Sequence, residues 1–179
     1  MLSKFIDHYC RVIRFVMVVL LAIMFLLVAG NVFLRYGFNS GLTVSEELAR
    51  WFFVWVVFLG AIVAMKEGAH LGTDSLIARL PLAGKKFCFV ATNILMLFVC
   101  WLLARGAWDQ MVVNRDTTSP VMGASVSIFY ASGLVLAVSG ALILLNQLWR
   151  LISGQIQESE LIGIRESEEE EIDLPTPLK

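Results

Sequence analysis

Four long apolar blocks, separated by short polar stretches, constrain the fold of this chain more than any other feature. The blocks run at about 15–34, 46–66, 87–105 and 122–149. A helix needs about 20 apolar residues to cross the ~30 Å core of a bilayer, and the first block has that length. Hydrophobic residues make up 58% of the chain and charged residues only 16%, which excludes an ordinary soluble domain. The sequence therefore predicts an all-α integral membrane protein with four transmembrane helices.

The second block is too short to cross the membrane without the polar residues that precede it. Its charge-free part is only about 15 residues long, so the helix has to begin within "TVSEELAR" (43–50) in order to cross. Thr43 and Glu46 have the spacing of a capping box. Glu46 and Glu47 lie four and three residues before Arg50, which favours local ion pairing. We interpret Glu46, Glu47 and Arg50 as the start of a helix at the outer membrane surface, with contact to a large partner subunit as the functional alternative.

The distribution of lysine and arginine predicts the orientation of the spans. If the N-terminus is cytoplasmic, ten of these residues lie on the cytoplasmic side and four on the other side. The positive-inside rule then places both termini in the cytoplasm. A cleaved signal peptide is the competing interpretation of the first block. Its apolar run is longer than the usual ~7–15 residues, and Arg35 follows it as a stop-transfer flank would, so we favour a span.

Two segments outside the spans carry separate expectations. Between the second and third spans, a short interfacial helix that begins at Thr73 or Asp74 and ends before Pro81 is one interpretation, and an ordered loop is the other. The four-helix membrane domain is expected to cover 1–152. The remaining tail, 153–179, holds eight acidic and two basic residues, so we expect it to be disordered in the cytoplasm.

The fourth block contains a regular line of small and polar residues. Serine or asparagine recurs every seven residues, with glycine beside two of these positions. Small residues let helices approach closely in lipid, and Ser and Asn can hydrogen-bond across the contact. The line is therefore predicted to face protein, either the other helices of this chain, which we favour, or a partner subunit. Its members are Ser125, Ser132, Gly133, Ser139, Gly140 and Asn146.

The sequence offers no group that points to catalysis. Ionisable residues are absent from the middle of every block, where they would mark an ion or proton pathway. His8 and His70 lie outside the blocks, which argues against a haem held between helices. Cys10, Cys88 and Cys100 lack metal-site spacing. We predict no catalytic residue, cofactor or metal. A membrane anchor of a respiratory complex and a structural four-helix membrane protein remain as alternative interpretations.

Four short elements occur together in a distinctive order. They are "NVFLR" (31–35), "EELAR" (46–50), "FLGA" (58–61) and "HLGTD" (70–74). With its size and four spans, the chain resembles the small permease subunit of tripartite ATP-independent periplasmic (TRAP) transporters, the DctQ-like family. The resemblance implies a subunit, not an enzyme, of a bacterial inner-membrane transporter that imports organic acids, such as C4-dicarboxylates or sialic acid, with Na⁺.

The same resemblance implies two protein partners: a large multi-span DctM-like permease subunit, which this chain braces, and a periplasmic DctP-like binding protein. Membrane lipid is the third expected partner, and no nucleic acid is expected. Charged residues on the predicted periplasmic side are candidates for docking the binding protein through complementary charge. For each of them the alternative is an ordinary helix-end residue. These candidates are Arg35, Arg50, Arg105, Asp109, Arg115 and Asp116.

Overall fold

The computed structural model describes residues 2–67 and 82–153, and this part of the chain contains four long helices. Each of the four is long and apolar enough to cross a membrane. The prediction of an all-α protein with four spans is confirmed. The predicted interfacial helix and nearly all of the acidic tail lie outside the described residues. The helices are α1 (Leu2–Phe38), α2 (Thr43–Glu67), α4 (Leu82–Val113) and α5 (Ser127–Ile152).

The helices continue beyond the charges that delimit the predicted spans. α1 has 37 residues, or roughly 55 Å of helix, whereas a bilayer core is only ~30 Å thick. It passes through Asp7, Arg11 and Arg14 at one end and Arg35 at the other without interruption. Charges mark where a segment leaves the hydrocarbon, but they do not end a helix whose backbone hydrogen bonds continue.

α5 begins at Ser127, later than the start at 122 that the sequence predicts. The preceding loop pairs its own backbone groups, since the Val126 N–H donates to the Thr117 carbonyl at 2.9 Å. Gly123 adopts a φ of 66°, a left-handed conformation that suits glycine at this tight turn. Ser125 therefore lies in the loop rather than on the helix, which corrects its place in the predicted line of small residues.

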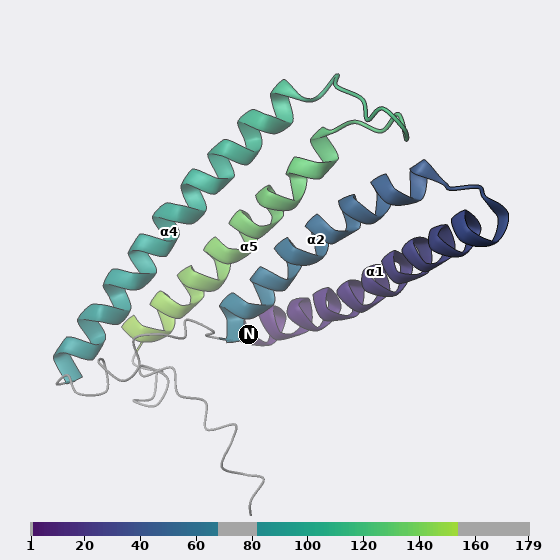
Figure 1. The fold of residues 1–179 in the computed structure, drawn as a ribbon. Helices are drawn as coiled ribbons and strands as arrows, with labels where there is room; N and C mark the ends of the chain where they lie inside the picture. Colours follow the sequence, from purple (N-terminus) through teal and green to yellow (C-terminus); the bar gives the residue numbers. More distant parts are fainter. Residues whose placement is uncertain (1, 68–81, 154–179) are drawn as a thin grey trace, which may run out of the picture.

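The four helices form one open layer and not a closed bundle. Figure 1 shows them side by side in the order α4, α5, α2, α1, and packing is most extensive between neighbours in this order. Both the α1–α2 turn and the α4–α5 loop lie at one end of the molecule, which we call the turn end. The start of α1 and the end of α5 lie at the opposite end.

Small residues of α5 lie where it meets its neighbours. Ser132, Gly133, Ser139 and Gly140 are buried, whereas Asn146 is only partly buried. A Cβ built on Gly133 would lie 3.5 Å from the Ala107 Cβ of α4 and 3.8 Å from a ring carbon of Phe58 on α2. Within this chain, the line thus packs on α2 and α4, as close helix contacts in membranes require.

A second contact joins α5 to the outermost helix of the layer. The hydroxyls of Tyr9 on α1 and Ser139 on α5 lie 2.7 Å apart and share a hydrogen bond. Around this level, side chains of α1, α2 and α5 form the hydrophobic core. The buried members of this core are Ile6, Cys10, Ile13, Leu59, Ile62, Val63 and Ile143.

Candidate functional site

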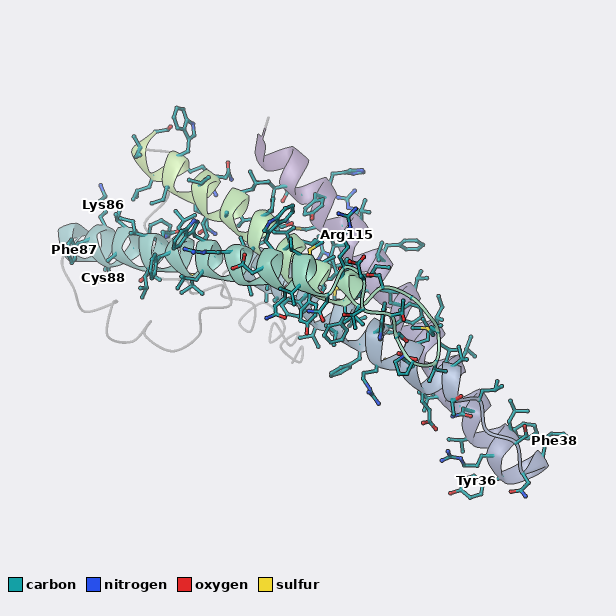
Figure 2. The ribbon with its side chains drawn as sticks, turned by 90° about the horizontal axis from the view of Figure 1, so that it is seen from above. Tyr36, Phe38, Lys86, Phe87, Cys88 and Arg115 are labelled. Carbon is teal, nitrogen blue, oxygen red and sulfur yellow. The ribbon has the colours of Figure 1, made fainter. Side chains whose placement is uncertain are left out.

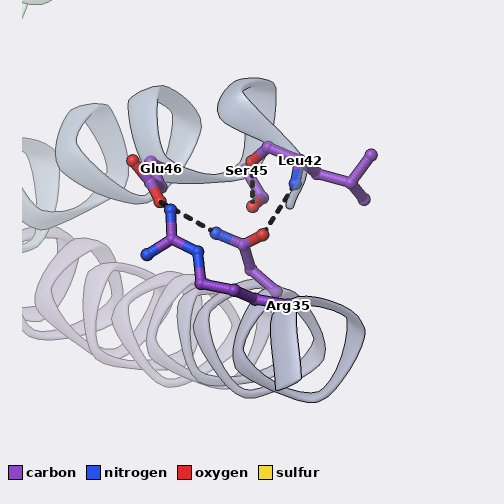
Figure 3. Close-up of polar contacts among 5 residues, drawn as sticks. Arg35, Leu42, Ser45 and Glu46 are labelled. Atoms are coloured by element: carbon purple, nitrogen blue, oxygen red, sulfur yellow. Dashed lines mark hydrogen bonds and ion pairs between the residues drawn. The ribbon is translucent and has the colours of Figure 1, made fainter. Parts of the chain in front are cut away.

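A polar cluster at the turn end joins α1 to the start of α2. Asn31 and Arg35 are one helical turn apart on α1, and both donate to Oε1 of Glu46 on α2 at 3.1 Å. The amide of Asn31 also accepts a 2.7 Å hydrogen bond from the Leu42 backbone N–H through Oδ1. Figure 3 shows this network, with the Ser45 hydroxyl donating to the Leu42 carbonyl at 2.8 Å. We call these five residues the turn clamp.

The local sequence explains why the chain turns here. Asn39 adopts a φ of 51°, which Asn tolerates better than most residues, and it ends α1. The first N–H groups of α2 lack partners within the helix, so they need acceptors from elsewhere. Asn31 of the neighbouring helix satisfies the N–H of Leu42, while Glu46 is turned toward α1. Among the described residues, the predicted capping box between Thr43 and Glu46 is absent.

The next residue, Glu47, faces a different neighbour. Its Oε1 accepts a hydrogen bond from the hydroxyl of Ser119 in the α4–α5 loop, and its Oε2 accepts one from the Met122 N–H at 3.3 Å. Ser119 is buried. Two consecutive carboxylates of α2 thus hold two different elements, α1 and the α4–α5 loop.

The predicted local pairing of these carboxylates with Arg50 does not occur. Glu46 and Glu47 bind tertiary partners instead, and Arg50 is exposed with no hydrogen bond or ion pair to any described residue. A local pair at a helix surface contributes only ~0.2–0.5 kcal/mol, so better-placed partners on other elements easily displace it. Of the three helix-start residues, Arg50 is the one without a hydrogen bond or ion pair to a described residue.

The opposite end of the α1–α2 pair is held by charges. Nζ of Lys66 lies 2.6 Å from Oδ1 of Asp7, and the Arg14 guanidinium lies 3.4 Å from Oε1 of Glu67. Such exposed pairs contribute up to about 1 kcal/mol each. With the turn clamp they fix the register of α1 on α2 at both ends.

The candidate docking residues lie on four separate elements at or near the turn end, and one of them is Arg50, exposed near the start of α2. Arg35 belongs to the tip of α1 and to the turn clamp. Arg105 and Asp109 are exposed on α4, and the guanidinium of Arg105 lies 5.9 Å from the ring centroid of Trp101. Arg115 and Asp116 are exposed in the α4–α5 loop. The structure therefore exposes all six but gathers them into no single cluster.

Three contributors to the site are not among the residues that the sequence singled out as functional. Asn31 and Ser45 are buried in the turn clamp, and Ser119 is buried under Glu47. Asn31 and Arg35 lie four residues apart, so they share one face of a helix that ends in a short turn, and this shared face is the signal that could have identified Asn31. No comparable pattern marks Ser119, since its partner lies 72 positions away in the sequence.

The contacts at the turn end hold structural elements of the chain together. Within residues 2–67 and 82–153, no group of three or more His, Cys, Asp or Glu side chains is placed to hold a metal ion. The polar side chains of the turn end bind one another and the backbone, which holds the connections of the layer on α2.

We expect Glu47→Ala to loosen the α4–α5 loop while leaving the helices formed. The substitution removes the acceptor of both the Ser119 hydroxyl and the Met122 N–H, at a cost of about 1–2 kcal/mol. Hydrogen exchange of the loop amides should accelerate by about tenfold, a factor that corresponds to ~1.4 kcal/mol. Arg50→Ala, on the exposed side of the same helical turn, is the control and should change nothing. Unaltered exchange in the Glu47 variant would show that the loop is held by other contacts.

Comparison with known proteins adds the family context. The sequence profile of tripartite ATP-independent periplasmic transporters, DctQ component, matches residues 11–154. A protein of Haemophilus influenzae named as a TRAP transporter small permease is 33% identical over 147 residues, covering 82% of this chain and 89% of the relative. Another of the same name and organism is 33% identical over 138 residues, covering 77% and 82%. The C4-dicarboxylate TRAP transporter small permease DctQ of Vibrio cholerae is 29% identical over 109 residues, covering 57% and 45%.

Proposed function

The chain belongs to the DctQ family of TRAP transporter small permeases, and from this premise we propose that it braces the large permease subunit of such a transporter. The family is a component of a transporter and not an enzyme, and its members work with a large permease and a binding protein. The chain itself is a multi-pass membrane protein. What we propose beyond this is the mechanical role of the chain and the surfaces that carry it out.

The observation that supports bracing most directly is the open layer. In a closed four-helix bundle each helix buries one face within the chain. Here only 6% of the most apolar 18-residue stretch of α1 is buried within the chain, and only 11% of the corresponding stretch of α4. The value for α5 is 39%. The two outer helices of the layer therefore present wide apolar faces that lipid or another subunit has to cover. An open layer whose α1–α2 connection is held by the turn clamp is suited to lie against a partner subunit.

Co-purification tests this role. The tagged chain, extracted in mild detergent, should recover a large multi-span permease, and uptake should disappear when the small subunit alone is deleted. Charges at the α2 start provide a finer test, because Arg50 is exposed and Glu46 and Glu47 are engaged within the chain. Loss of the permease from an Arg50→Glu preparation would identify this position as a subunit contact. Recovery of the chain alone, with normal uptake in the deletion strain, would contradict the bracing role.

The proposal also includes the location of the chain and its orientation in the membrane. We place the chain in the bacterial inner membrane with both termini in the cytoplasm, which puts the turn end in the periplasm. The start of α1 and the end of α5 lie at the same end of the molecule, as this orientation requires. Reporter fusions at the two termini and in the α4–α5 loop should give opposite signals.

The substrate is proposed to be an organic acid imported with Na⁺. The Vibrio relative is named for C4-dicarboxylates, and another relative, of Haemophilus influenzae, is named for sialic acid. The described helices have no charged group in the middle of a span that could bind either acid, so selection is expected in the other components. Uptake of labelled dicarboxylate and sialic acid by the complete transporter, with and without Na⁺, separates these possibilities.

Arg115 is the docking candidate with the clearest test. It is exposed in the α4–α5 loop, whereas Lys86 is exposed at the other end of α4, as Figure 2 shows. We expect Arg115→Glu to lower uptake several-fold at low ionic strength and less at high salt, because steering by exposed charges is screened by salt. Lys86→Glu is the matched control and should leave the binding-protein dependence unchanged. Equal uptake by wild type and the Arg115 variant at low salt would remove this residue from the docking surface.

A further inference from the structure

We propose that the turn end of α1, together with the start of α2, binds one phospholipid with a primary-amine headgroup, of the phosphatidylethanolamine class. The phosphate would lie at Arg35, the ammonium at Glu46, and an acyl chain along the adjoining face of α1. The lipid site does not require the bracing role, and it gives Arg35 and Glu46 a lipid ligand in place of the protein partners considered above. It rests on the joining of a cavity that is polar at one side to an apolar groove, and on the two charged groups that line the cavity.

Two hollows adjoin on this part of the molecule. One, of about 200 Å³, is polar at one side, where Asn31, Arg35, Ser45 and Glu46 line it. The other is a shallow apolar groove of about 690 Å³ along α1, with Phe25, Ala29, Phe33 and Gly37 among its walls. Val28, Val32 and Tyr36 line both. A ligand that fills the two together has to be polar at one end and apolar along the rest, as a phospholipid is.

The cavity offers one group of each charge. Arg35 uses one terminal nitrogen to donate to Oε1 of Glu46, and its side chain is 61% exposed, so other N–H groups of its planar fork can reach a phosphate. Oε1 of Glu46 accepts both bonds of the turn clamp, whereas Oε2 accepts none from the described residues. The Glu46 side chain is 52% exposed. A primary ammonium can donate to this free oxygen while its own phosphate meets the guanidinium.

These charges also discriminate among headgroups. An anionic headgroup without an amine would bring its negative charge to Arg35 but leave the Glu46 carboxylate without a cation. A quaternary ammonium has the right charge but no N–H to donate, so it loses the hydrogen bond to Oε2. Chemistry thus favours the primary amine over both. A transmembrane helix of a partner would cover the apolar groove, but an apolar helix would supply neither charge to the polar cavity.

The position along the helix suits a headgroup at the membrane surface. Tyr36 is 84% exposed and lies at the border between the two hollows. Figure 2 shows Tyr36 and Phe38 at the far tip of α1. Aromatic side chains with a polar tip are typical of the interface between hydrocarbon and headgroups. Phe25 and Phe33, which are also exposed, lie on the apolar side of Tyr36 and would contact the acyl chain.

Competition among lipids on the unmodified chain is the primary test. The full chain is purified in detergent, alone and with its large subunit, delipidated, and offered equal amounts of phosphatidylethanolamine, phosphatidylcholine and phosphatidylglycerol with identical acyl chains. Native mass spectrometry then counts the bound lipids. We expect one retained lipid per chain, with phosphatidylethanolamine favoured about five- to tenfold over each competitor, the ratio expected for the net contribution of one ordinary hydrogen bond. Equal retention of the three lipids would overturn the proposal.

Two glycine variants test the groove without touching the charges. A Cβ at Gly37, which lines the groove, or at Gly30, which does not, would meet no atom within 4 Å. Leucine at either helical position should therefore be tolerated by the fold. Gly37→Leu should fill the groove and lose the lipid, while Gly30→Leu should keep it. If Gly37→Leu retains the lipid, the groove is not a lipid site. If this variant retains the lipid but no longer binds the large subunit, the groove is instead a subunit contact.

Discussion

Replacing Gly140 with leucine is expected to push α5 away from both of its neighbours and to destabilise the packing of the helices. A Cβ at this position would lie 2.9 Å from Cε and 3.1 Å from Sδ of Met65 on α2, and 3.3 Å from Sγ of Cys100 on α4. The flexible end of Met65 can move aside for one methyl group, but not for a whole leucine side chain. Overpacking of this kind costs about 1–3 kcal/mol. Thermal unfolding in detergent, followed by circular dichroism, measures the loss.

The matched control is Gly106→Leu on α4. A Cβ at Gly106 would meet nothing within 4 Å, so the same substitution in a neighbouring helix should leave the melting temperature nearly unchanged. Gly140→Ala should fall between the two. Because Gly140 lies at the contact of three helices, its leucine variant should also reduce recovery of the large permease. Identical melting of the Gly140 and Gly106 leucine variants would mean that close packing of α5 is not required.

The fold could be predicted because the membrane limits the choices so strongly. A long apolar block has to form a helix, since every backbone polar group in hydrocarbon needs a partner within the segment. That argument yields the number and type of elements and explains why the four spans agree with the structure. It does not determine helix ends, and α1 accordingly continues to Leu2 and Phe38 on either side of its apolar block. The order of helices in the layer is likewise a tertiary property that no hydropathy pattern contains.

The line of small residues shows where periodicity helps and where it stops. From Ser132 to Gly140 the seven-residue repeat lies on α5, and its members are buried against neighbouring helices. Ser125 continues the repeat in sequence but lies in a loop, where its hydroxyl donates to the Arg115 carbonyl at 2.8 Å. A repeat read from sequence assumes an unbroken helix, and the backbone pairing of the loop ends that helix first.

The paired carboxylates illustrate a second limit. The spacing of four and three residues to Arg50 suggests this arginine as the local partner of both carboxylates. Consecutive residues on a helix point about 100° apart, however, so Glu46 and Glu47 face different elements. In the fold Glu46 binds α1 and Glu47 binds the α4–α5 loop. The sequence correctly places these residues at the start of a helix at one end of its span. Their partners come from elements that only the folded layer brings near.

Replacing Asn31 with leucine should open the turn clamp and destabilise the tip of α1. Asn31 is 8% exposed, and its side chain donates to Glu46 at 3.1 Å and accepts from the Leu42 N–H at 2.7 Å, whereas leucine can do neither. Loss of both bonds is expected to cost about 1–3 kcal/mol. Trypsin cleavage after Arg35, which requires local opening, should then be at least about tenfold faster if the loss reaches ~1.4 kcal/mol.

Asn114→Leu is the control for Asn31→Leu, because the Asn114 amide, one residue past the end of α4, bonds only to Gln110 of the adjoining helix. A double-mutant cycle of Asn31→Leu with Glu46→Gln distinguishes the clamp from a general packing effect. If Asn31 acts through Glu46, the two changes together should cost less than the sum of the single changes. Full additivity, with unchanged cleavage at Arg35, would show that the turn between α1 and α2 is held by its backbone geometry and not by this side chain.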